Sequence, residues 1–184
     1  DPSPGAGDNL ISSMMSVVIG KKFFEAKKSG KNLLQNTRLK IISFGAEEAA
    51  TKGSQAYAKR HKAEFEQLPT YALCPDCIYK MRDFKFLKSD QNGLVKTSPE
   101  MMRECLEIAH EFGYNPKTEI FPFGGGATDA APLQRAGVQT LIPMAMSTEL
   151  IRDDLVQHTP GDVPEFIDRE VVEATMKIMA EYIW

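Results

Sequence analysis

Four positions in this 184-residue sequence carry side chains that bind metal ions or transfer protons: Asp8, the adjacent pair Glu47 and Glu48, Asp76 and His158. Carboxylates and an imidazole are ligands for divalent metals of hard or borderline character, and zinc is the leading candidate for such a mixed set. Two adjacent glutamates that point into one cleft repel each other, and a bound cation relieves that repulsion. The pair can also divide the chemistry, with one glutamate on the metal and the other taking a proton from metal-bound water.

Each position also has an ordinary structural explanation. Asp8 precedes an apolar helical pattern and suits an N-cap. Glu47 and Glu48 suit the first turn of a helix, where the helix dipole favours negative charge. Asp76 is a plausible turn former, and His158 a plausible loop residue. The metal interpretation therefore depends on whether the fold brings the four positions together.

The predicted elements place these residues where strands end. Apolar spacing and turn residues predict helices over residues 9–30, 49–65, 98–112, 128–136 and 168–182, and strands over 38–44, 71–77, 81–87, 118–121 and 138–144. Ser98 followed by Pro99 is a helix start, with serine as the cap. Alternating strands and helices predict an α/β sheet with helices on both faces. In such folds, functional residues gather in the loops at strand ends.

Composition predicts one folded domain over residues 1–184, with 42% hydrophobic and 26% charged residues. The net charge of −3 gives no long-range attraction to nucleic acid or to an anionic membrane. No apolar run approaches the roughly 20 residues needed to span a bilayer. The opening DPSPGAGDN lacks the basic and apolar regions of a signal peptide. We therefore expect neither a nucleic-acid nor a membrane partner.

Five segments, in order and at similar spacing along essentially the whole chain, resemble motifs of the M28-type zinc aminopeptidases. They are 3–9 (SPGAGDN), similar to a metal-binding PGADDN segment; 44–48 with 53–54 (FGAEE and GS), similar to AEE…GS; 72–76 (ALCPD), similar to a strand that ends in a carboxylate ligand; 128–129 with 136–138 (TD and AGV), similar to SD…AGI; and 158–162 (HTPGD), similar to HT-x-x-D. Each motif alone is weak, but five in order identify the chain as a member of this family.

The resemblance implies a three-layer fold, in which a mixed sheet carries helices on both faces, and removal of N-terminal residues from peptides. It implies that Asp8 bridges two zinc ions, that Glu48 and His158 complete the first site, and that Asp76 serves the second. Glu47 would be the general base, which deprotonates the metal-bound water and passes the proton to the leaving amine.

Two further polar residues lie in the segment before the last predicted strand. Thr128 and Asp129 are candidates for supporting the ligands or contacting substrate. For Asp129, helix capping is an equal alternative.

The sequence departs from the family pattern at one ligand. The second family site needs a histidine from a His-x-Asp motif upstream of Asp8, and no residue here matches it, although Asp1 is a candidate for the aspartate. His61 and His110 fall in the wrong order and on predicted helices. We therefore expect one zinc position with three ligands and a second, weaker position that keeps two. We also expect that the N-terminal part of the family domain is missing from this chain.

Three alternatives remain open. Cys74 and Cys77 form a C-x-x-C pattern, which suits two reduced cysteines beside Asp76, a disulfide, a redox pair or part of a structural zinc site. A glutaminyl-cyclase-like or deacylating enzyme would use the same metal scaffold. A metal-free binding module on the same fold is the third alternative, although it would be expected to lose Glu47, Glu48 and His158.

Overall fold

The computed structural model describes residues 3–121, 126–149 and 154–184, so Asp1 lies outside the described residues. The helices are α1 (Ile11–Lys28), α2 (Lys52–Gln67), α3 (Pro99–Glu111), α4 (Ala130–Arg135) and α5 (Arg169–Ile183), with short helical turns η1 (Ala6–Leu10), η2 (Met81–Asp83) and η3 (Pro164–Phe166). The strands are β1 (Tyr71–Leu73), β2 (Asp76–Ile78), β3 (Lys85–Leu87), β4 (Ser89–Asp90), β5 (Val95–Lys96), β6 (Lys117–Glu119) and β7 (Gln139–Ala145).

The longest strand, β7, organises the main sheet. Strands β1 and β2 both run parallel to β7 along the same edge, and β3 pairs antiparallel with its other edge. Strand β6 extends the sheet by pairing parallel with β3. Strands β4 and β5 form a separate antiparallel pair. The sheet is therefore mixed, and the predicted ligand Asp76 is the first residue of β2.

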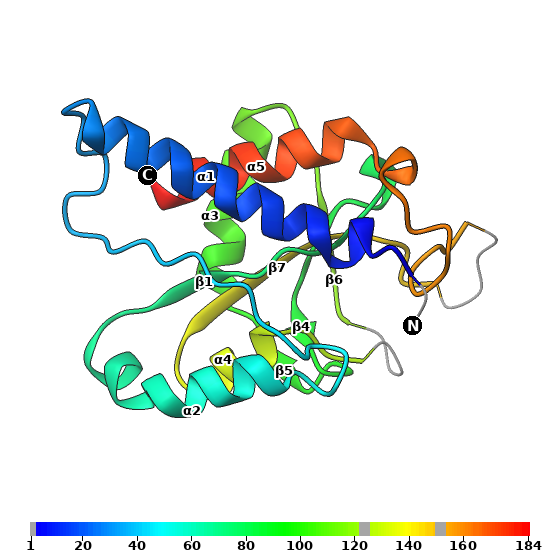
Figure 1. Ribbon diagram of the computed structural model, residues 1–184, viewed down its shortest axis with the longest axis horizontal. Helices are drawn as coiled ribbons and strands as arrows, with labels where there is room; N and C mark the ends of the chain where they lie inside the picture. Colours follow the sequence, from blue (N-terminus) through cyan, green and yellow to red (C-terminus); the bar gives the residue numbers. More distant parts are fainter. Residues whose placement is uncertain (1–2, 122–125, 150–153) are drawn as a thin grey trace.

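Helices cover both faces of this sheet (Figure 1). On one face, α1, α3 and α5 bury a cluster that includes Met15, Met101 and Ile178 against Phe86 and Leu141 of the sheet. On the other face, α2 and α4 pack together around a second cluster that contains Ala58, Phe65, Leu133 and Val138. The predicted α/β architecture with a mixed sheet and two helical layers is confirmed. Within the described residues, no helix is both long and apolar enough to cross a membrane.

Several predicted elements are confirmed, with shorter strands. The Ser98 side chain accepts a hydrogen bond from the Met101 amide, and Pro99 begins α3, as the sequence predicted. The predicted strand over 71–77 is divided into β1 and β2 around Pro75. In the predicted strand over 81–87, the first residues form the turn η2, and only β3 is extended.

The predicted buried strand over residues 38–44 is wrong. These residues form no strand, and Ile41 and Ile42 are each 41% exposed. Instead of pairing with β1, the segment is held to α2 by ion pairs from Arg38 and Lys40 to Glu64. An apolar run becomes a strand only where a sheet edge satisfies its backbone groups. Within the described residues, β7 is the one partner of β1, and a cleft separates β1 from this segment.

Candidate metal centre

Asp8 lies in the turn η1, directly before α1. Its side chain is 10% exposed, and the peptide bond from Asp8 to Asn9 is cis. The Asn9 side chain donates to the Pro75 carbonyl at 3.1 Å, which ties this turn to the segment between β1 and β2. The capping alternative for Asp8 finds no support, because no side chain caps η1 or α1.

The Asp162 carboxylate fixes the backbone around Asp8. It is fully buried, and it accepts hydrogen bonds from the Gly7 amide at 2.6 Å and the Asp8 amide at 3.3 Å. It also accepts from the Tyr79 hydroxyl at 3.0 Å. A Cβ at Gly7 would lie 2.0 Å from the Tyr79 ring, so only glycine allows this close approach. Asp162, at the end of the HTPGD segment, therefore positions Asp8 of the SPGAGDN segment.

Glu47 and Glu48 occupy a tight turn before α2, and not the helix itself. Ala46, Ala50 and Thr51 have positive φ angles, which are uncommon for residues other than glycine. The turn packs against the start of α2, where a Cβ at Gly53 would lie 2.2 Å from the Gly45 carbonyl oxygen. Gly53 of the GS segment is therefore needed for the turn that carries Glu47 and Glu48 to pack against α2.

Asp76 and Cys77 lie at an irregularity in β2. Asp76 aligns with Met144 of β7 and Ile78 with the next residue, Ala145, so Cys77 is an extra residue in the strand. Cys77 also has a positive φ of 50°. Successive side chains of a regular strand point to opposite faces, and a bulge redirects them. Here the bulge brings both Asp76 and Cys77 towards Asp8.

The structure brings the predicted ligands together in two groups that share Asp8. In the first group, single ligand atoms of Asp8, Glu48 and His158 lie within 4.8 Å of one another. The His158 Nε2 atom is 2.7 Å from Glu48 Oε1 and 3.2 Å from Asp8 Oδ2. In the second group, Asp8, Asp76 and Cys77 meet the same distance limit. The two groups come from four segments that are far apart in the sequence.

Sequence reasoning gave no role to Gln157, which lies beside Asp8. Its side-chain amide donates to Asp8 Oδ2 at 2.8 Å and to the Cys77 sulfur at 3.3 Å. The only sequence signal for this contact is that Gln157 directly precedes His158. The sequence also gave no indication that Cys77 lies close to Asp8, although the C-x-x-C pattern placed Cys77 next to Asp76.

The concentration of negative charge changes the pKa values of the acidic groups. Burial, and then the charges of Glu48, Asp129 and Asp8, raise the pKa of Glu47 to about 7. Burial and the charges of Asp8 and Glu47 raise the pKa of Asp76 well above its ordinary value. A general base is most effective when its pKa lies near the working pH. Among the predicted site residues, Glu47 has the pKa of a proton carrier.

The pKa of His158 responds to the same charges. Partial burial of the ring would lower it, but the hydrogen bond to Glu48 and the charges of Glu48 and Asp8 outweigh burial and raise it. A raised pKa favours the protonated imidazole, which complements the negative charge of Glu48 and Asp8. A neutral imidazole is a metal ligand, so metal and proton compete for His158.

Thr128 and Asp129 lie next to this centre and have different surroundings. The Thr128 backbone and hydroxyl both donate to Asp90, at 3.0 and 2.9 Å, so Thr128 anchors the chain before α4. Asp129 occupies the N-cap position of α4, but its side chain makes no capping hydrogen bond. Ser54 hydrogen bonds to Asp129, and the buried Oδ1 atom of Asp129 has no hydrogen-bond partner.

The donor set fits a divalent cation. The first group offers two carboxylate oxygens and one imidazole nitrogen, which are zinc ligands. Among the described residues, the ion pair of Asp8 is with His158, and neither Asp8 nor Asp76 pairs with a lysine or arginine. Buried carboxylates are normally paired or bound to metal. An added cation would therefore relieve the repulsion that, after burial, raises the pKa of Glu47.

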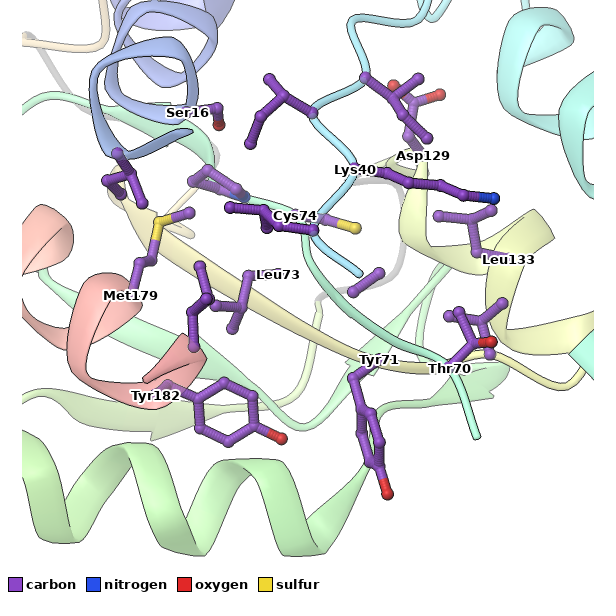
Figure 2. Close-up of a pocket in the computed structure, with 18 of the residues that line it drawn as sticks. Ser16, Lys40, Thr70, Tyr71, Leu73, Cys74, Asp129, Leu133, Met179 and Tyr182 are labelled. Carbon is purple, nitrogen blue, oxygen red and sulfur yellow. The ribbon is translucent and has the colours of Figure 1, made fainter. Parts of the chain in front are cut away.

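A cleft of about 1370 Å³ leads to these residues. It runs along the open side of β1, between that strand and the segment 36–44, and Asp8, Glu47 and Asp76 lie in its lining. Lys40, Cys74 and Asp129 face the same space (Figure 2). The acidic centre is therefore accessible to a ligand from outside.

Comparisons with known proteins identify the family of this chain and support its fold. The sequence profile of Peptidase family M28 matches residues 1–183. A search of curated proteins finds no significant match. Among solved structures, BSAP, a zinc aminopeptidase from Bacillus subtilis, is 20% identical, with a TM-score of 0.77 over 98% of this chain and 42% of that protein. LapB from Legionella pneumophila is 18% identical, with a TM-score of 0.77 over 98% of this chain and 47% of LapB.

A glutaminyl cyclase from Bacteroides thetaiotaomicron is also similar. It is 18% identical, with a TM-score of 0.56 over 81% of this chain and 48% of that protein. The chain thus spans less than half the length of these structural relatives. It belongs to peptidase family M28, since the family profile covers nearly all of its residues.

Proposed function

We propose that this chain is part of a zinc-dependent aminopeptidase, which hydrolyses the N-terminal peptide bond of its substrate. The observation that carries the proposal is the arrangement of Asp8, Glu48 and His158 around one point, with Glu47 beside them. Membership of a peptidase family and the fold shared with zinc aminopeptidases support it.

Each residue has a proposed role. Asp8, Glu48 and His158 would hold one zinc ion, and Asp76 would serve a second position together with Asp8. A bound divalent cation supplies Lewis acidity for hydrolysis of a carbonyl group. Asp162 would position Asp8 through the backbone hydrogen bonds described above.

Glu47 would carry the proton. Its carboxylate is half-buried, lines the cleft and is not part of either ligand group. It would accept a proton from the attacking water and donate that proton to the amine nitrogen as the C–N bond breaks. The charge of Asp129 would add to burial and to the charge of Glu48 in raising the pKa of Glu47.

The substitution Glu47→Gln tests the mechanism, because it removes the proton carrier while preserving shape. With aminoacyl anilide substrates, we expect activity to fall by about 10²- to 10⁴-fold, the usual contribution of general acid–base catalysis. Bound zinc, measured by elemental analysis, should be unchanged. Glu66→Gln is the matched control, since Glu66 is 63% exposed on α2. Undiminished activity of Glu47→Gln would exclude this mechanism.

A glutaminyl-cyclase-like reaction is the second candidate, favoured by the similarity to a solved glutaminyl cyclase. A panel of aminoacyl, N-acyl and N-terminal glutamine substrates separates peptide hydrolysis, deacylation and cyclisation. The absence of heat on zinc addition in a calorimeter would favour the third alternative, a metal-free binding module.

A further inference from the structure

We propose that Cys77 is a ligand of a second metal position, together with Asp8 and Asp76. This inference rests on the proposed function, since both positions share Asp8. The family pattern calls for a histidine from upstream of Asp8 at the second position, and no residue of this sequence matches it. The described structure places a thiol there, on a residue that sequence reasoning left out of the site.

One ligand atom from each of Asp8, Asp76 and Cys77 lies within 4.8 Å of the others, so one ion can contact all three. The bulge at Cys77 produces this arrangement, because it interrupts the alternation that would turn neighbouring side chains to opposite faces. Cys77 is 3% exposed, so the fold buries its thiol against two carboxylates.

In the part of the chain that the structure describes, Asp76 has one side-chain hydrogen bond, from the Cys77 thiol. The Gln157 amide nitrogen donates to both Asp8 and Cys77, at 2.8 and 3.3 Å. An uncharged amide is a weak substitute for a cation between these groups. A metal ion would satisfy all three side chains, and the thiol would lose its proton to solvent as the metal–sulfur bond forms.

Cys77 differs in its surroundings from Cys74, its neighbour in the C-x-x-C pattern. Cys74, Cys77 and Cys105 are free thiols, so Cys77 is not held in a disulfide. Cys74 lines the cleft but belongs to neither ligand group. The pattern therefore divides into one thiol at the metal centre and one outside it.

Sulfur ligation predicts a metal preference. Thiolates favour zinc, cobalt and cadmium over magnesium or manganese, which prefer oxygen ligands. The first position, with oxygen and nitrogen ligands, should be less selective. The two positions of this chain should therefore differ in their affinity for soft metals.

Cobalt titration of the metal-free chain tests the proposal. Wild-type protein should bind two equivalents and develop the near-ultraviolet sulfur-to-cobalt charge-transfer absorption. Cys77→Ser should lose this absorption, keep one equivalent and bind the second at least tenfold more weakly. Cys74→Ser, in the same motif, should behave like wild type. If Cys77→Ser keeps the absorption and both equivalents, or if Cys74→Ser alone loses the absorption, the proposal is overturned.

Two further outcomes separate this inference from the proposed function. Suppose that the wild-type chain binds one equivalent of cobalt without the sulfur absorption, and that His158→Ala no longer binds this equivalent. This result would overturn the Cys77 site alone. A chain that binds no metal would overturn both. Cadmium-113 NMR of wild-type protein needs no variant: a resonance shifted by sulfur is expected, and resonances typical of oxygen and nitrogen ligands alone would overturn the proposal.

Discussion

Asp162 holds three groups around Asp8 through one buried carboxylate. Removal of its carboxylate in Asp162→Ala would leave the Gly7 amide and the Tyr79 hydroxyl without their partner. Hydrogen bonds to charged groups contribute about 1.5–3 kcal/mol each, and stranded buried donors add to the loss. We expect the free energy of unfolding, measured in urea, to fall by about 3 kcal/mol.

Tyr79→Phe is the graded control for this prediction. It removes one of the hydrogen bonds to Asp162 and leaves both backbone donors in place. We expect a loss of about 1–2 kcal/mol and nearly unchanged zinc affinity, because the Asp8 turn stays anchored. Asp162→Ala should weaken zinc binding as well. Equal zinc affinity in wild type, Tyr79→Phe and Asp162→Ala would contradict the positioning role of Asp162.

At the scale of elements, the start of α2 sets the position of the glutamate turn. In Gly53→Ala, the new Cβ would lie 2.2 Å from the Gly45 carbonyl oxygen, which is backbone and cannot rotate away. Overpacking of this kind costs about 1–3 kcal/mol. We expect thermal unfolding at lower temperature and weaker zinc binding, because the turn carries Glu48.

Gly45→Ala is the matched control on the other side of the same contact. A Cβ at Gly45 would meet nothing within 4 Å, and Gly45 has no positive φ. We expect its stability and zinc affinity to stay close to wild type. The packing explanation of the GS segment fails if Gly45→Ala is as damaging as Gly53→Ala.

The pairing of β3 with β6 contains a partly buried ion pair. Lys85 Nζ is 2.9 Å from Glu119 Oε2, and the lysine side chain is 3% exposed. Partial burial would raise the pKa of Glu119, but the hydrogen bonds from Lys85 and Thr148 outweigh it and lower the pKa below 4.5. A lowered pKa stabilises the fold above the unfolded value, and this stabilisation is lost as the pH falls through the folded value.

Glu119→Gln should therefore be less stable than wild type by about 2 kcal/mol at pH near 7, because it leaves Lys85 buried without a counter-charge. The difference should shrink at an acidic pH below 4.5, because wild-type Glu119 is protonated as the pH falls through its lowered pKa. Urea unfolding at both pH values measures it. Glu111→Gln, at the exposed end of α3, is the control and should show little change at either pH. A pH-independent difference for Glu119→Gln would argue against the ion pair.

Sequence patterns predicted the helices best, because caps and apolar spacing are local. Ser98 and Pro99 marked the start of α3 correctly. The strand prediction for residues 38–44 was wrong because apolar residues favour an extended conformation but do not determine which strand they pair with. In the described sheet, no strand pairs with β1 on that side. Strand formation depends on a neighbour that the local sequence cannot name.

The residues of the candidate site also fall into those that the sequence predicted and those that it did not. Residue types and family motifs selected Asp8, Glu48 and His158, which the fold brings within 4.8 Å of one another. The sequence did not predict the contacts of Cys77 and Gln157, because these contacts depend on the bulge in β2 and on the turn that contains Gln157. Such tertiary features leave no periodic signal in the sequence.

For the whole molecule, a bound zinc ion would link segments that the chain keeps far apart. Asp8 precedes α1, Glu48 precedes α2, and His158 follows β7 in a turn where its φ is positive. These ligands meet only in the folded chain, so zinc should bind the folded state and stabilise it globally. At free zinc about 100-fold above the dissociation constant, the gain in unfolding free energy is about 2.7 kcal/mol.

Thermal unfolding with zinc and with a chelator measures this linkage. The unfolding temperature of wild-type protein should rise with zinc and return to its initial value when the metal is removed. In His158→Ala, most of this zinc-dependent rise should be lost. His110→Ala is the matched control, because His110 lies exposed on α3, where it contacts Asn115. If zinc stabilised His158→Ala as much as wild type, the ion would bind elsewhere. If it stabilised neither protein, the three side chains would not form a metal site.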